Sequence, residues 1–150
     1  MSVIAAREAF YQKQQIFILW IFDSFSAESE EQLFAQKYIL VSNVYNVFVL
    51  DKEAMERSIQ ENTIYLKCYY VDFYIRNGKI VDDKMISQLV SLSDLTFREE
   101  DYKVFYIDAI EKRNQLENEL KNIQKAESFL KKIEDIYSLS LIHISEPTRL

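Results

Sequence analysis

Few side chains in this chain could carry acid–base, metal or phosphate chemistry, and those few are isolated from one another. The sequence contains one histidine, His143, and one cysteine, Cys68. Histidine exchanges protons most readily near neutral pH and is the commonest metal ligand, so a zinc or di-metal site needs more histidine than this chain has. The single glycine, Gly78, excludes a glycine-rich phosphate loop. We therefore predict a protein that is not an enzyme, with no catalytic residues, no metal and no cofactor.

The segment that contains His143 resembles a translated sequencing adapter. Residues 139–149 read LSLIHISEPTR, which matches the in-frame translation of the transposase mosaic end used in short-read libraries. Such a scar is set aside before a fold is derived. We therefore expect residues 139–150 to be non-native read-through, and residues 1–138 to form a single domain, either complete or truncated at its C-terminus. Without this segment the chain has neither histidine nor proline, because Pro147 also lies in it.

Composition and charge exclude several classes of partner. The net charge is −6 and the acidic residues are spread along the chain, whereas a phosphate backbone requires clustered Lys and Arg. The densest apolar run, 16–22, is far shorter than the roughly 20 residues that cross a bilayer. A lone cysteine provides no disulfide framework. These features predict a cytoplasmic protein that does not span a membrane and does not favour nucleic acid, and the many Lys and Ile residues indicate a bacterial or phage gene.

The apolar pattern predicts an all-α fold. Hydrophobic residues make up 49% of the chain, with one glycine and one proline, the residues that β-turns normally use. Apolar side chains recur at helical spacing over most of the sequence. We expect an antiparallel bundle of four to five helices with a long, coiled-coil-like C-terminal helix. The expected helices are 3–25, 29–50, 51–77, 82–90 and 97–137.

Side-chain caps define most of these helix boundaries. The expected caps are Ser2, Ser29 with Gln32, Asp51, Asp82 or Asp83, and Thr96 with Glu99. The secondary structure of two segments stays undecided. Periodicity does not exclude a strand at 16–22, and Asn77-Gly78 suits either a helix C-cap, which we prefer, or the turn of a β-hairpin.

The helix expected over 97–137 provides the predicted interaction surface. Apolar side chains recur there at seven-residue spacing with charged flanks, as in a seam that packs against another helix. That second helix belongs to the same chain, to a second copy in a homodimer, or to a protein partner. The surface residues are Tyr102, Ala109, Leu116, Ile123, Leu130, Ile133 and Tyr137.

A short stretch within this helix suggests a different class of protein. The run IEKRN at 110–114 is similar to the Arg-Asn-x-x-x-His helix of HEPN-type ribonucleases, small helical bundles of toxin and abortive-infection systems. The resemblance implies that Arg113 and Asn114 match the active-site helix. Asn118 stands where that family has its catalytic histidine, and an amide does not exchange protons near neutral pH. The resemblance therefore implies an inactive or binding member.

The preferred function is that of a non-enzymatic helical interaction or regulatory protein, with its contact surface on the long helix. The first alternative is a degenerate HEPN-like ribonuclease-fold protein that acts on RNA or neutralises a nuclease. The second alternative is the N-terminal part of a larger protein, in which the long helix is a connector.

Overall fold

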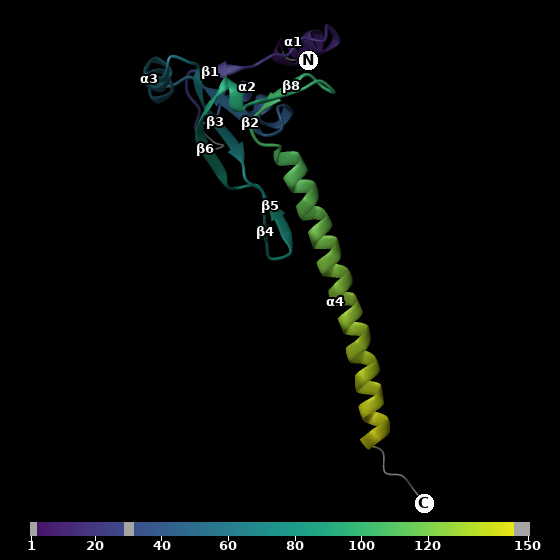
Figure 1. Cartoon of the computed structure of the whole chain (residues 1–150). Coiled ribbons are helices and arrows are strands. Elements are labelled where there is room, and N and C mark those ends of the chain that lie inside the picture. The colour runs from purple at the N-terminus through teal and green to yellow at the C-terminus, as the bar shows by residue number, and fades with distance from the viewer. Residues whose placement is uncertain (1–2, 29–31, 146–150) are drawn as a thin grey trace, which may run out of the picture.

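The computed structural model describes residues 3–28 and 32–145, with side chains as far as residue 140. Residues 3–28 and 32–108 form a head, and one long helix, α4 (Ala109–Ser145), projects away from it (Figure 1). Several residues named above lie outside the described part, namely Ser2, Ser29, Pro147 and the side chain of His143.

The head is built on a four-stranded sheet with the strand order β1-β2-β3-β6. β1 (Ile21–Phe22) runs parallel to β2 (Asn46–Val49). β2 is antiparallel to β3 (Tyr65–Val71), and β3 is antiparallel to β6 (Met85–Ser91). The central strands β2 and β3 therefore hold the sheet together.

Small hairpins and short helices complete the head in the part of the chain that is described. The hairpins pair β4 (Tyr74–Arg76) with β5 (Lys79–Val81), and β7 (Thr96–Arg98) with β8 (Lys103–Phe105). The helices are α1 (Val3–Lys13), α2 (Phe34–Ser42), α3 (Lys52–Glu61) and the 3-10 turn η2 (Leu92–Asp94).

The core lies on both faces of β2. Val47 and Val49 point into one buried cluster, whereas Phe48 points into a second cluster with Leu66. Successive side chains of a strand point to opposite faces, so one strand supplies both clusters. Ala109, the first residue of α4, belongs to the cluster of Val47 and Val49, and the base of α4 is thus part of the core.

The prediction of an all-α bundle is wrong, because strands occupy much of the region expected to be helical. In β3, Leu66 and Tyr70 are four residues apart, as on one face of a helix. With Cys68 between them they also alternate along a strand, and these three residues are buried. The spacing of these apolar residues therefore fits both the 3.6-residue repeat of a helix and the two-residue repeat of a strand. The aromatic and β-branched residues around it favour the strand.

The helix boundaries change accordingly. The helix expected at 3–25 ends at Lys13, and the helix expected at 29–50 is only Phe34–Ser42. The segment expected as a helix at 82–90 is largely β6, and the capping box expected at Thr96 is instead the start of β7. One cap is confirmed: the Asp51 carboxylate accepts a hydrogen bond from the Ala54 N–H at 2.9 Å and begins α3.

Asn77-Gly78 is the turn of the β4–β5 hairpin, and the preferred helix cap is wrong. Both residues have positive φ, +53° and +73°, as a type I′ turn requires. Elsewhere the left-handed positions are occupied by residues other than glycine, among them Val44, Tyr45 and Asn62. The chain thus makes sheet turns with almost no glycine, which is why its low glycine content does not exclude strands.

A buried asparagine joins the sheet to the segment that leads into α4. Asn46 is 0% exposed, and its Nδ2 donates to the carbonyl oxygens of Val44 and Ile107, each at 2.8 Å. Its Oδ1 accepts from the N–H groups of Tyr106 and Ile107 at 3.0 and 3.2 Å, and from the thiol of Cys68 at 3.4 Å. The bonds with Tyr106 and Ile107 link residues about sixty positions apart in the chain.

Candidate interaction surface

The first turns of α4 are attached to the head by a cap and by core packing. Asp108 Oδ1 accepts a hydrogen bond from the Glu111 N–H at 2.9 Å, and Asp108 Oδ2 accepts one from Arg98 Nη1 at 3.2 Å. Leu116 packs against the same cluster as Ala109. The helix therefore begins at Ala109, later than residue 97, where the sequence predicted its start.

One carboxylate of the head binds two lysines beside this helix base. Asp72 accepts a hydrogen bond from Lys112 Nζ of α4, and its other oxygen lies 3.3 Å from Lys84 Nζ. The bond from Lys112 lowers the pKa of Asp72 most; burial raises it, and Lys84 lowers it again, so that the net shift is downward. Asp72 is thus ionised at neutral pH and ties the first turn of α4 to the sheet.

Arg113 is held between two aromatic rings of the head. Its Nη1 donates to Tyr45 Oη at 3.2 Å, and its guanidinium carbon lies 5.7 Å from the ring centre of Tyr45 and 5.6 Å from that of Phe73. The two rings pack edge to face. A cation–π contact of this kind stabilises by about 0.5–1 kcal/mol, so Arg113 is a second anchor for α4.

Of the three residues of the HEPN-like stretch, the structure sets Arg113 apart from the other two. Arg113 faces the rings of the head, whereas Asn114 and Asn118 are exposed on α4. The anchoring contacts explain Arg113 without an RNA substrate. The resemblance itself stays a prediction.

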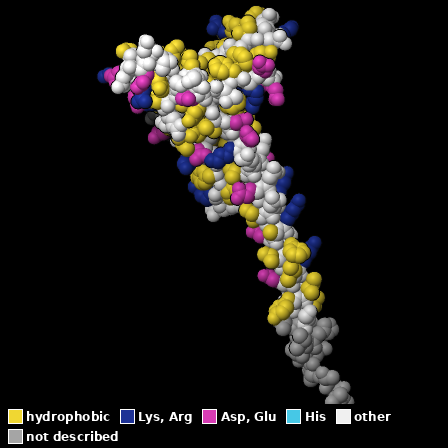
Figure 2. Space-filling model, viewed as in Figure 1, with side chains coloured by type: hydrophobic (Ala, Val, Ile, Leu, Met, Phe, Trp, Pro, Cys, Tyr) yellow, Lys and Arg dark blue, Asp and Glu magenta, His cyan; other side chains and the backbone are white. Residues whose placement is uncertain are grey.

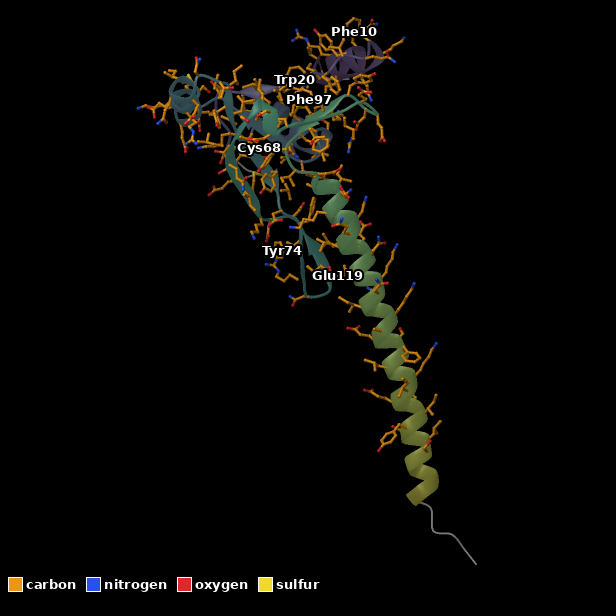
Figure 3. All side chains as sticks on the ribbon, viewed as in Figure 1. Phe10, Trp20, Cys68, Tyr74, Phe97 and Glu119 are labelled. Carbon is orange, nitrogen blue, oxygen red and sulfur yellow. The ribbon has the colours of Figure 1, made fainter. Side chains whose placement is uncertain are left out.

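Beyond the β4–β5 hairpin, α4 runs free of the head. Every side chain from 121 to 140, the stretch we call the stalk, is exposed. Figure 2 shows apolar side chains along this free helix, and Figure 3 shows them with no other element beside them, below the level of Tyr74 and Glu119. Before residue 139, six large apolar side chains of the stalk are 42–64% exposed, and we call them the apolar stripe: Ile123, Phe129, Leu130, Ile133, Ile136 and Tyr137.

The stripe contains four of the seven residues predicted for the interaction surface: Ile123, Leu130, Ile133 and Tyr137. The other three lie in the head or at its edge. Ala109 and Leu116 pack against the core, and Tyr102 lies between β7 and β8 with its ring against Phe17. The first part of the seven-residue repeat, as far as Leu116, therefore packs within the chain, and the part from Ile123 onward is exposed.

The stripe has two further members, Phe129 and Ile136, that the sequence-based list of surface residues did not include. Each directly precedes a residue of the seven-residue lane. A shallow groove runs along the stalk on the side of Phe129 that faces away from Leu130. Three of its lining residues are lysines, and the full set is Lys121, Gln124, Lys125, Ser128, Phe129 and Lys132. Lysines thus border the apolar stripe on the side of Phe129.

The head has a separate pocket of about 590 Å³ beside Tyr45. Its floor is apolar, with Leu40 and Val71, and carboxylates of Asp82 and Asp83 line it. Asp83 is already bound to the hairpin, since its Oδ1 accepts a hydrogen bond from Tyr74 Oη at 2.5 Å. Within the described residues, no three His, Cys, Asp or Glu side chains are grouped as a metal site would require.

The junction of Tyr45, Asp72, Lys112 and Arg113 was missed by sequence reasoning. Lys112 and Asp72 are forty residues apart and belong to different elements, and no local spacing relates them. The sequence offered only one indication of this junction: Arg113 is a charged residue next to the apolar residues that recur at seven-residue spacing in the helix. The contact follows from tertiary structure alone.

The described part of the chain contains no helix that is both long and apolar enough to cross a membrane. Comparison with curated proteins and with solved structures finds no match. Residues 1–110 match the model of a protein family described as Domain of unknown function (DUF6035). The match covers the head and ends in the first turn of α4. The chain therefore belongs to the DUF6035 family.

Proposed function

We propose that this protein is a non-enzymatic interaction protein whose α4 associates with another helix through the apolar stripe. One observation carries the proposal: the six large apolar side chains of the stripe stand on the part of α4 whose side chains, from 121 to 140, are all exposed. Twenty residues of helix extend about 30 Å. Because Asp72 and Arg113 anchor α4 to the head, the association of α4 also brings the head to the partner. We expect the association to occur in the cytoplasm.

The stability of isolated helices supports this proposal. A single helix in water is marginal, because most helical stability in proteins comes from packing of an amphipathic face. Burial of one large apolar side chain contributes roughly 1.5–3 kcal/mol, before the cost of association is subtracted. A partner helix would therefore stabilise the stalk, whereas the head is stabilised by its own core.

The test is the molar mass of the full chain in solution, measured by light scattering after size exclusion at low and high protein concentration. We expect a mass above that of the monomer for the wild-type chain. The double variant Leu130→Glu/Ile133→Glu places two charges in the stripe and is expected to reduce the mass to that of the monomer, because a buried unpaired carboxylate is costly.

A matched control introduces the same two charges away from the stripe. Gln124 and Ser128 are exposed, and at 100° per residue they lie about 160° from the centre of the stripe. Gln124→Glu/Ser128→Glu is expected to keep the wild-type mass. A monomer for the wild-type chain at every concentration, or loss of association in the control as well, would contradict the proposal.

A further inference from the structure

We infer that Asn77-Gly78, the turn of the β4–β5 hairpin, is a site of spontaneous deamidation, at which the side-chain amide of Asn77 is converted to aspartate and isoaspartate. Both residues are exposed. Apart from its chain neighbours, no described residue has an atom within 4 Å of the position that a Cβ of Gly78 would occupy, so water reaches the turn. The reaction uses only this chain and water, and it does not depend on the association proposed for α4.

Deamidation begins when the backbone nitrogen of Gly78 attacks the side-chain carbonyl carbon of Asn77. The attacking N–H gives its proton to water, a new N–C bond closes a cyclic imide, and the amide nitrogen takes up a proton and leaves as ammonia. Water then adds to either carbonyl carbon of the imide, and the C–N bond at that carbon breaks as the nitrogen takes up a proton. One product is aspartate, and the other is isoaspartate, in which the main chain runs through the former side chain.

The residue after the asparagine decides how readily this attack occurs. Glycine has no Cβ to hinder the approach of its nitrogen, whereas a β-branched side chain crowds it. The chain provides a matched comparison, because Asn62 is also exposed and has φ +52°, against +53° for Asn77. Asn62 is followed by Thr63, whose N–H donates to the carbonyl oxygen of Ser58 at 3.2 Å. Of these two asparagines, Asn77 is therefore the reactive one.

The hairpin is held more firmly at its base than at its turn. β4 and β5 pair over only three residues each, and a two-stranded hairpin alone is marginally stable in water. The hydrogen bond from Tyr74 Oη to Asp83 lies at the base of the hairpin, so the turn end opens at the lower cost. Because imide formation requires rotation of Asn77 out of the turn conformation, the reaction proceeds from the briefly opened turn.

Positive charges flank the turn on both sides. Arg76 precedes Asn77 and Lys79 follows Gly78, and both cations are exposed. The nitrogen of Gly78 gains negative charge as it loses its proton, and nearby positive charge stabilises that state. The same two cations favour the carboxylate that deamidation leaves at position 77.

The two products affect the hairpin differently. Aspartate keeps the turn, because Asp-Gly also forms a type I′ turn, whereas isoaspartate lengthens the main chain and breaks it. Both strands of the hairpin contact α4 (Figure 1), and Ile80 of β5 packs against the same cluster as Leu116 of α4. Isoaspartate at position 77 therefore loosens the hairpin beside the base of α4.

The test incubates the full chain at mildly alkaline pH and follows each asparagine by mass spectrometry of proteolytic peptides. Electron-transfer fragmentation distinguishes isoaspartate from aspartate. We expect conversion at Asn77 to be roughly tenfold or more faster than at Asn62, because glycine leaves its nitrogen open and Thr63 does not. Amides of β4 and β5 should then exchange with solvent faster in the incubated chain than in the fresh chain.

Asn77→Gly is the control variant, since Gly-Gly also suits a type I′ turn and has no side-chain amide to react. Its amide exchange in β4 and β5 should not change during the same incubation. A synthetic peptide of residues 72–83 measures the reaction without the head. Equal rates at Asn77 and Asn62, or an Asn77 that stays an amide in the full chain while the peptide is converted, would overturn the inference. Conversion to isoaspartate without faster exchange would overturn the loosening of the hairpin.

Discussion

Asn46 makes more side-chain hydrogen bonds than an ordinary core residue, and its loss should destabilise the head severely. Asn46→Ala leaves the N–H groups of Tyr106 and Ile107 without their acceptor. Each unsatisfied buried group costs about 1–3 kcal/mol. We expect the free energy of unfolding to fall by at least about 3 kcal/mol, measured from urea denaturation curves.

The neighbouring thiol provides the matched comparison. Cys68 is equally buried, and burial raises the pKa of its thiol, so it behaves as a small apolar group with a weak S–H donor. Cys68→Ala should therefore cost only about 1 kcal/mol. An Asn46→Ala variant no less stable than Cys68→Ala would show that the hydrogen bonds of Asn46 do not hold the segment before α4.

At the scale of elements, the sequence predicted the start of α3 and most of α4, but not the sheet. Asp51 and the long run after Ala109 have strong local signals, a cap and an uninterrupted stretch of helix formers. β3 and β6 have apolar residues whose spacing suits a helix and a strand equally, and only pairing with distant strands decides between them. The junction of Asp72 with Lys112 was unpredictable for the same reason, since it is a contact between distant residues.

The Asp72 junction should make the attachment of α4 depend on pH. The folded pKa of Asp72 lies below its ordinary value of about 3.9. The ionised carboxylate therefore contributes stability that is complete above that value and is lost as the pH falls through the folded pKa. We expect Asp72→Asn to lower the free energy of unfolding by about 0.5–1 kcal/mol near neutral pH, since both lysines are partly exposed.

The measurement is the difference in unfolding free energy between wild type and Asp72→Asn from neutral pH downward. This difference should be constant from neutral pH to about pH 5 and should shrink as the pH falls further through the folded pKa of Asp72. Asp82→Asn removes an exposed carboxylate of the same region that makes no ion pair among the described residues, and it is the control for the loss of one negative charge. A difference for Asp72→Asn that grows as the pH falls would be inconsistent with the ion pairs.

At the scale of the whole molecule, the described residues form a folded head and a stalk whose side chains are all exposed. The sequence indicated the stripe, because its seven-residue spacing is a property of one helix. It could not indicate where the stripe becomes free, since Ala109 and Leu116 obey the same spacing and yet are packed in the head. That division depends on where the β4–β5 hairpin meets α4 in space (Figure 1).

The most direct test of the account is amide hydrogen exchange along the stalk at low and high protein concentration. If α4 pairs through its apolar stripe, amides of 121–138 should exchange more slowly as the concentration rises, while those of the sheet in the head stay unchanged. Leu130→Glu/Ile133→Glu should abolish this protection. Rapid exchange over 121–138 at every concentration, with the head fully protected, would contradict the claim that the stalk is an association surface.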